Sequence, residues 1–307
     1  MKTRILLAIA LTLLTLGAAY GVQRVLFKSP PESAVAVGSA PDPNTKAKAN
    51  TLGQATALEV LGQVQRKDAQ GHWVDIRVGD RLDIDTVVRT SRGASARLAV
   101  GENVVVEVPE EAELAVAEVS EGLSRVRLDD GRIASFVKSK EGFQLRVEFQ
   151  GSDVKAETSG GAFYAMKQGA GPISVASKEG TTRVSSQAGA VAVGAGEQTV
   201  VEPGKAPSVP VKIPTSLLLK LGRIPSQLRT RETTIQGSTS PGAIVSLNGE
   251  RTTANADGQF EQHVALQEGE NALTVEVVDA VGRKQKQDLP KIRVDSRPPN
   301  VVGKVKW

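Results

Sequence analysis

Two histidines and two groups of carboxylates are the side chains of this sequence that could perform catalysis or bind a metal. His72 and His263 are the only histidines, and each could serve as a general base or a metal ligand. They fall in different predicted domains, so a shared triad or metal site would require an unusual interdomain contact. We therefore predict that both histidines occupy surface positions on strands.

The carboxylates form two groups that could supply an acid–base pair or bind calcium. The first group comprises Glu107, Glu110, Glu111 and Glu113, and the second comprises Asp80, Asp83 and Asp85. Neither group follows the ligand spacing of a calcium-binding loop, and charged turn residues explain both groups more simply. A hydrolase that uses the acidic residues Glu110 and Glu111 is the alternative.

Two glycine-containing segments have some features of ligand loops. Gly194-Ala195-Gly196 lacks the third glycine and the following helix of a nucleotide-binding loop, so we interpret it as a β-turn. Asn255-Ala256-Asp257-Gly258 could bind calcium, but an Asx-turn accounts for it without a metal. Cysteine is absent, which excludes thiol nucleophiles, thiolate metal sites and disulfides. We predict no catalytic, cofactor-binding or metal site.

The basic residues do not predict a nucleic-acid interface. The net charge is +4 over 307 residues, and aromatic side chains make up 3% of the sequence. A nucleic-acid binder gathers Lys and Arg on one face with stacking aromatics between them. Basic residues accumulate only near the C-terminus, where their alternating spacing indicates charged strand edges. They are Arg283, Lys284, Lys286, Lys291, Arg293, Arg297, Lys304 and Lys306.

The N-terminus carries a membrane-directed segment. Lys2 and Arg4 precede the uncharged, mostly apolar residues 5–22, whose length lies between that of a signal-peptide core and that of a membrane-spanning helix. We expect residues 1–28 to be an uncleaved signal anchor, with a cleaved signal peptide as the alternative. The positive-inside rule then predicts a single-pass inner-membrane protein whose bulk is periplasmic. Residues 29–55, which contain four prolines, predict a disordered spacer.

The remaining sequence predicts an all-β fold. From Leu58 onward, apolar and polar residues alternate with a period of two, most clearly over residues 143–149. Similar short runs are separated by the turn signals Gly101-Glu102-Asn103, Asp129-Asp130-Gly131 and Glu179-Gly180. No long helical periodicity occurs in this part of the sequence, so we expect a compact body of many short strands, arranged as a roll or a sandwich.

Residues 56–208 also contain a diffuse pattern of apolar positions and turn glycines. The pattern consists of Leu61-Gly62-Gln63-Val64, His72-Trp73, Gly79-Asp80-Arg81-Leu82, Val88-Arg89-Thr90, Ala96-Arg97-Leu98, Val126-Arg127-Leu128, Gly131-Arg132-Ile133 and Ala195-Gly196-Glu197-Gln198. It resembles the FecR domain, named for the periplasmic regulator of ferric citrate uptake. The resemblance implies a periplasmic recognition domain with Trp73 buried in its core, and an exposed, sugar-stacking Trp73 is the alternative. Relatives that control sigma factors carry a cytoplasmic helical domain, for which we find no room before Ile5.

Beyond a connector at residues 209–232, residues 233–297 carry a second set of strand and turn signals. Asn248-Gly249 is a strong hairpin signal, and Asp257-Gly258 opens the next strand. Further matching residues are Gly237, Pro241-Gly242, Val245, Phe260, Leu266, Gly269, Asn271, Asp279 and Gly282. This segment resembles the bacterial immunoglobulin-like modules of the glucodextranase B type. The resemblance implies a β-sandwich with an accessory rather than catalytic role, followed by a tail at residues 298–307.

These features together predict a non-enzymatic protein of the cell envelope. We expect its periplasmic domains to bind an envelope protein or a polysaccharide, without cofactors and without nucleic acid. A carbohydrate- or peptidoglycan-binding module is the first alternative, and a regulator of an extracytoplasmic-function sigma factor is the second. The sequence leaves the ligand and the oligomeric state open.

Overall fold

The computed structural model of the chain describes residues 53–297, and all regular secondary structure in this range is β-strand. The expected all-β class is therefore confirmed for these residues. Within them, no helix has the length and apolar character needed to cross a membrane. The predicted signal anchor at residues 1–28, most of the predicted spacer and the predicted tail at residues 298–307 lie outside the described range.

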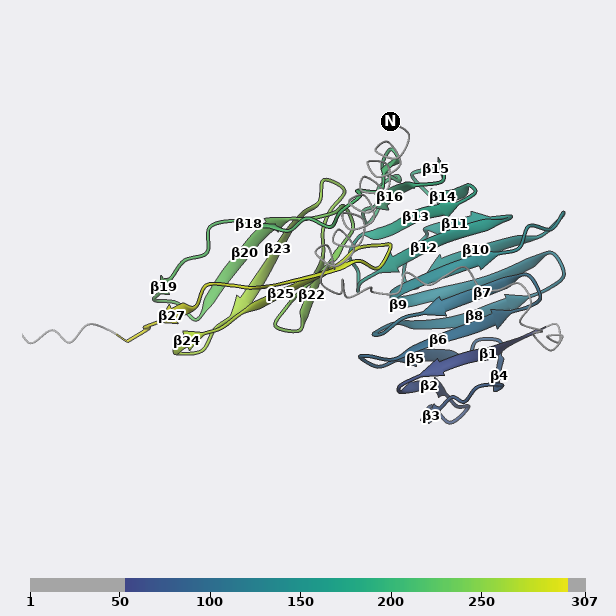
Figure 1. The fold of residues 1–307 in the computed structure, drawn as a ribbon, viewed down its shortest axis with the longest axis horizontal. Helices are drawn as coiled ribbons and strands as arrows, with labels where there is room; N and C mark the ends of the chain where they lie inside the picture. The colour runs from purple at the N-terminus through teal and green to yellow at the C-terminus, as the bar shows by residue number, and fades with distance from the viewer. Residues whose placement is uncertain (1–52, 298–307) are drawn as a thin grey trace, which may run out of the picture. The chain divides into compact units, whose positions relative to one another are not determined.

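The first seventeen strands form one continuous sheet, whose strands lie stacked from β1–β5 (blue) to β14–β16 (green) in Figure 1. The strands are β1 (Gln54–Leu61), β2 (Val64–Lys67), β3 (Trp73–Asp75), β4 (Arg81–Asp83), β5 (Val87–Thr90), β6 (Ser95–Val100), β7 (Val104–Val108), β8 (Glu113–Val119), β9 (Leu123–Val137), β10 (Gln144–Phe149), β11 (Lys155–Thr158), β12 (Gly161–Lys167), β13 (Ile173–Glu179), β14 (Thr182–Ser186), β15 (Gly189–Val193), β16 (Glu197–Val201) and β17 (Val211–Lys212).

This sheet folds into two layers that share β9. Layer A has the order β4–β1–β6–β7–β9–β12–β13–β16–β17. Layer B has the order β3–β2–β5–β8–β9–β10–β11–β14–β15. Pairing within the two layers is antiparallel except between β9 and β10, which run parallel.

The period-two alternation of the sequence places one face of each layer in a common core. In β10, Leu145, Val147 and Phe149 are buried, whereas the residues between them face outward. Phe163, next to the glycine pair at residues 160–161, is also buried in this core. The alternation thus predicts correctly which residues of these strands pack together.

One predicted turn is wrong. Asp129-Asp130-Gly131 does not close a hairpin, because β9 continues through it from Leu123 to Val137. Residues 123–130 pair in layer B, and residues 131–137 pair in layer A. Gly131 lies at the change of layer with a φ of +85°, and a Cβ there would lie 2.5 Å from the carbonyl oxygen of Glu111. The glycine therefore permits a bend within one strand rather than a reversal of the chain.

Ten further strands build a second body around a separate core. They are β18 (Lys220–Leu221), β19 (Gln227–Leu228), β20 (Glu232–Ser238), β21 (Ile244–Leu247), β22 (Glu250–Thr253), β23 (Gln259–Ala265), β24 (Gly269–Asn271), β25 (Thr274–Val278), β26 (Lys284–Asp288) and β27 (Ile292–Val294). Their sheets have the orders β18–β20–β23, β19–β27–β24 and β22–β21–β25–β26. Val275, Val277 and Ile292 are among the fully buried residues of this core.

The predicted hairpin of the second body is confirmed. Asn248 and Gly249 both have positive φ, 51° and 93°, as the two central residues of a type I′ turn require, and they join β21 to β22. In the connector, Leu217, Leu219 and Leu221 pack against the second core, whereas Leu218 is exposed. The predicted charged edge is found in part: Lys284 and Lys286 lie on β26, which forms the end of its sheet, whereas Arg293 lies on β27, between β19 and β24.

Candidate recognition surface

A half-exposed tryptophan lies on the outer face of layer B. Trp73 is directly opposite Lys67 in the β2–β3 pair, and Gln65 is opposite both Asp75 of β3 and Arg89 of β5. These residues face outward because their neighbours Val64 and Val88 point into the core. The prediction that Trp73 is buried in the core is therefore wrong, because its short edge strand turns the indole to the outer face.

Arg89 holds the indole in place. Its guanidinium carbon lies 3.8 Å from the centroid of the Trp73 ring, a cation–π geometry, and the Lys67 ammonium lies 5.8 Å away. The Arg89 Nε and Nη2 atoms donate to Gln65 Oε1 at 3.2 and 2.8 Å. Gln65 Nε2 in turn donates to Asp75 Oδ1 at 2.9 Å. The ring is thus fixed by a chain of polar contacts that runs across three strands.

Beyond this cluster the outer face of layer B carries paired charges of alternating sign. Arg127 Nε lies 2.8 Å from Asp129 Oδ1, and Arg146 Nε lies 2.6 Å from Glu157 Oε1. Burial, together with the nearby Asp129 carboxylate, raises the pKa of Glu113 above its ordinary value. The face therefore offers one aromatic ring and ordered polar groups, which suit recognition of a polar ligand rather than of an apolar one.

The residues that position Trp73 are not evident from the sequence alone. Lys67, Gln65 and Arg89 alternate with buried neighbours, which is the available signal that they share an outer face. The alternation within each strand does not predict that β5 pairs with β2, nor the register of that pairing.

The two histidines lie on the surface, and they have separate partners. The side chain of His72 is 79% exposed, and its Nδ1 lies 3.6 Å from Asp68 Oδ2 in the turn before β3. The side chain of His263 on β23 is 85% exposed, and its Nδ1 shares a hydrogen bond of 2.9 Å with Thr234 Oγ1. The predicted surface position is confirmed for both, although His72 lies in a turn rather than on a strand.

The two acidic groups are engaged in local contacts. Glu110 Oε2 accepts a hydrogen bond of 2.7 Å from the Gly93 amide, and Glu107 Oε1 lies 3.5 Å from Arg97 Nε. Asp80 Oδ2 accepts from the Arg77 amide at 2.9 Å. Residues 53–297 contain no group of three or more His, Asp or Glu side chains arranged to hold a metal ion. These contacts support the interpretation of the acidic groups as charged turn and strand-end residues.

The two glycine-containing segments form turns. Gly194-Ala195-Gly196 joins β15 to β16, and the Glu197 amide donates to the Gly194 carbonyl at 3.0 Å. The Asn255 side-chain oxygen accepts hydrogen bonds from the amides of Asp257 and Gln259 at 3.0 and 2.8 Å. This is the predicted Asx-turn, and it leads into β23.

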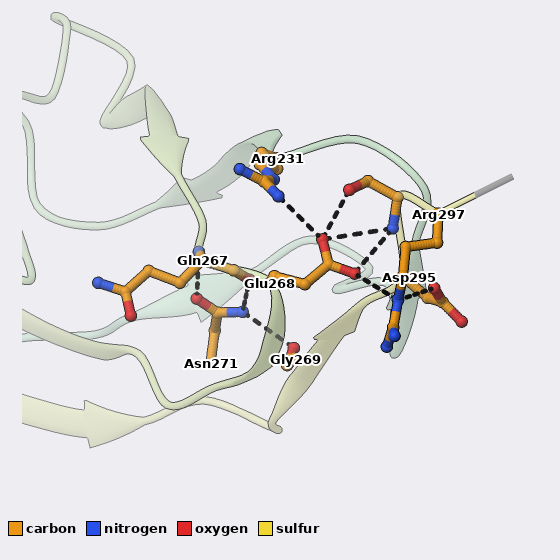
Figure 2. A network of polar contacts seen from close by, with 8 residues as sticks. Arg231, Gln267, Glu268, Gly269, Asn271, Asp295 and Arg297 are labelled. Atoms are coloured by element: carbon orange, nitrogen blue, oxygen red, sulfur yellow. Dashed lines mark hydrogen bonds and ion pairs between the residues drawn. The ribbon is translucent and has the colours of Figure 1, made fainter.

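A polar network ties the end of the described chain to the loop before β24 (Figure 2). The Glu268 carboxylate accepts hydrogen bonds from the Ser296 amide at 3.1 Å and from the Ser296 hydroxyl at 2.6 Å. Arg231 Nη2 donates to it at 3.4 Å, and Arg297 Nε lies 3.9 Å away. The bond from the Ser296 hydroxyl is the main cause that lowers the pKa of Glu268. The network is internal, so we assign it a structural role.

Asn271 closes the same loop. Its Oδ1 accepts from the Gln267 amide at 2.8 Å, and its Nδ2 donates to the Gln267 carbonyl at 2.8 Å and to the Gly269 carbonyl at 3.2 Å (Figure 2). The side chain thereby satisfies backbone groups that the turn leaves without partners.

Comparison with known proteins identifies one segment of the chain. Residues 227–295 match the family model described as Glucodextranase, domain B. The second body is similar to that family. This confirms the resemblance of the second β segment to a glucodextranase B-type module, whereas the FecR resemblance of the first stays a prediction. No curated protein matches the chain.

Among solved structures, the chain is similar to two crystal structures of a candidate anti-sigma factor from Parabacteroides distasonis ATCC 8503. The sequence identities are 14% and 15%, and the TM-score is 0.37 for both. Each match covers 41% of this chain and 59% of the other chain, so the chain matches less than two thirds of those structures. At this level of similarity the match carries no inference about fold or function.

Proposed function

We propose that this chain is a non-enzymatic recognition protein of the cell envelope and that the outer face of layer B around Trp73 contacts its ligand. The observation that carries the proposal is the half-exposed indole, which Arg89 holds at 3.8 Å on an otherwise polar sheet face. Aromatic and arginine side chains dominate the binding energy of protein interfaces. A fixed ring also loses little side-chain entropy on binding.

The envelope location in this proposal rests on the sequence. Lys2, Arg4 and the apolar residues 5–22 would hold the chain at the inner membrane with both β bodies in the periplasm. Protease added to spheroplasts, in which the outer membrane is permeabilised and the inner membrane is intact, should then degrade the β bodies. Protection from protease until lysis would contradict this location.

Crosslinking in intact cells, followed by mass spectrometry, tests the recognition surface. We expect a crosslinked partner with the native chain that is lost when Trp73 is replaced by Ala. Trp307→Ala is the control for the loss of a tryptophan, because Trp307 is the other tryptophan of the chain. Retention of the same partner by the Trp73→Ala chain would refute the assignment of the surface.

A polysaccharide is the second candidate ligand. Two observations favour it: the match of residues 227–295 to glucodextranase domain B, and the half-exposed Trp73 ring. Arg89 covers one face of the ring, so a sugar would stack on the other face. The Trp307→Phe chain leaves Trp73 as the sole tryptophan, so its emission can be followed by selective excitation of tryptophan. Quenching or a spectral shift on addition of murein fragments or soluble glucan would favour this candidate, and an unchanged spectrum would favour a protein ligand.

A further inference from the structure

The strand β15 (Gly189–Val193) is an open edge of layer B. Its strand partner within residues 53–297 is β14 alone. Val193 is buried and Val191 packs against the core, whereas Ala190 and Ala192 are exposed. The five residues Gly-Ala-Val-Ala-Val carry no charge.

The hairpin register shows which backbone groups of β15 point outward. Ser186 and Gly189 are paired across a two-residue turn, a pair that exchanges backbone hydrogen bonds with β14. Alternate residues follow the same pattern, so Val191 and Val193 also bond to β14. The N–H and C=O groups of Ala190 and Ala192 therefore point away from it, and neither residue has another backbone partner in the described structure.

The other edges of the two layers are protected against pairing. The strand β4 has three residues, of which Arg81 and Asp83 are charged, and β17 has two residues and ends at Lys212. The strand β3 has three residues and ends at Asp75. Short length and charge are the usual means by which proteins prevent edge strands from pairing. The strand β15 has neither of these protections.

We propose that two copies of this chain pair through β15, antiparallel about a two-fold axis at Val191. In this register Ala190 of one copy lies opposite Ala192 of the other, and their outward groups form four backbone hydrogen bonds. Gly189 lies opposite the partner's Val193, which pairs the smallest residue of the strand with a larger one. A second copy fits better than a charged peptide, because two identical uncharged strands meet without repulsion and a charged strand would find no opposite charge on β15.

Disulfide crosslinking tests this register directly, because the chain contains no cysteine. Full-length Ala190→Cys and Ala192→Cys chains are purified separately in mild detergent and oxidised alone or as an equimolar mixture. The proposed register places position 190 opposite position 192 at a Cα separation of about 5.5 Å, which a disulfide spans. Like positions are offset by two residues and lie too far apart. We expect a covalent dimer in the mixture and essentially none in either chain alone.

A proline substitution supplies an independent readout. Ala190→Pro removes an outward N–H without removing a hydrogen bond to β14, so the fold should be retained. Ala190→Ser keeps the N–H and is the matched control. Sedimentation should show the native and Ala190→Ser chains as dimers and the Ala190→Pro chain as a monomer, with circular dichroism unchanged. A native chain that is monomeric at all concentrations, crosslinking of either cysteine chain alone to the level of the mixture, or a dimer that survives Ala190→Pro would each overturn the proposal.

Discussion

The contact between Arg89 and Trp73 should contribute a measurable coupling free energy. A cation–π pair at an exposed site is worth about 0.5–1 kcal/mol, and the 3.8 Å separation is close enough for the full interaction. Replacing Arg89 with Ala also removes its two hydrogen bonds to Gln65, a further loss of about 1 kcal/mol. We expect Arg89→Ala to lower the free energy of unfolding by about 1.5–2 kcal/mol.

A double-mutant cycle separates the ring contact from the other losses. The native, Arg89→Ala, Trp73→Ala and doubly substituted chains are unfolded in urea and followed by circular dichroism. We expect a coupling of about 0.5–1 kcal/mol between Arg89 and Trp73. The same cycle with Lys67, whose ammonium lies 5.8 Å from the ring, should give a smaller value. A coupling below about 0.3 kcal/mol, as expected of independent sites, would refute the view that Arg89 fixes the indole.

Two further predictions concern the second body. Gly258→Ala should destabilise the chain by about 2–4 kcal/mol, because its Cβ would lie 2.2 Å from a backbone oxygen at a φ of +77°. Gly249→Ala, at a φ of +93° with no atom within 4 Å of the new Cβ, should cost only about 1 kcal/mol in urea unfolding. Equal losses of unfolding free energy in the two variants would show that the structure shifts to remove the close contact at position 258. Ser296→Ala should raise the pKa of Glu268 toward its ordinary value in an NMR titration. Because the folded-state pKa of Glu268 is lowered, its stabilising contribution is present above the unfolded-state pKa and is lost as the pH falls through the folded value. An unchanged pKa in the Ser296→Ala chain would contradict the assigned cause.

Local patterns predicted much of the fold. The alternation over residues 143–149 placed Leu145 and Val147 in the core, and Asn248-Gly249 marked a hairpin. Both features depend on residues that are adjacent in sequence, so the sequence contains the necessary information.

Features set by distant contacts were not predictable in this way. Asp129-Asp130-Gly131 has the composition of a hairpin turn, and only the close approach of the Glu111 carbonyl to Gly131 makes it a bend within β9. Trp73 lies in a three-residue edge strand, where pairing with β2 decides which way the ring faces. The sequence pattern specifies neither the close approach of Glu111 to Gly131 nor the orientation of the Trp73 ring, because both depend on residues elsewhere in the chain.

Both layers of the first body, which comprises β1 to β17, share β9, so this strand determines where the chain of that body could be cut. Within the described residues, β9 is the strand that belongs to both layers, so a chain break between Leu123 and Val137 would separate their hydrogen-bonded ladders. New termini placed at the exposed Gln187-Ala188 turn would leave both ladders whole. Circularly permuted or split versions of this protein should therefore tolerate termini at the tip of the β14–β15 hairpin and fail when the termini interrupt β9.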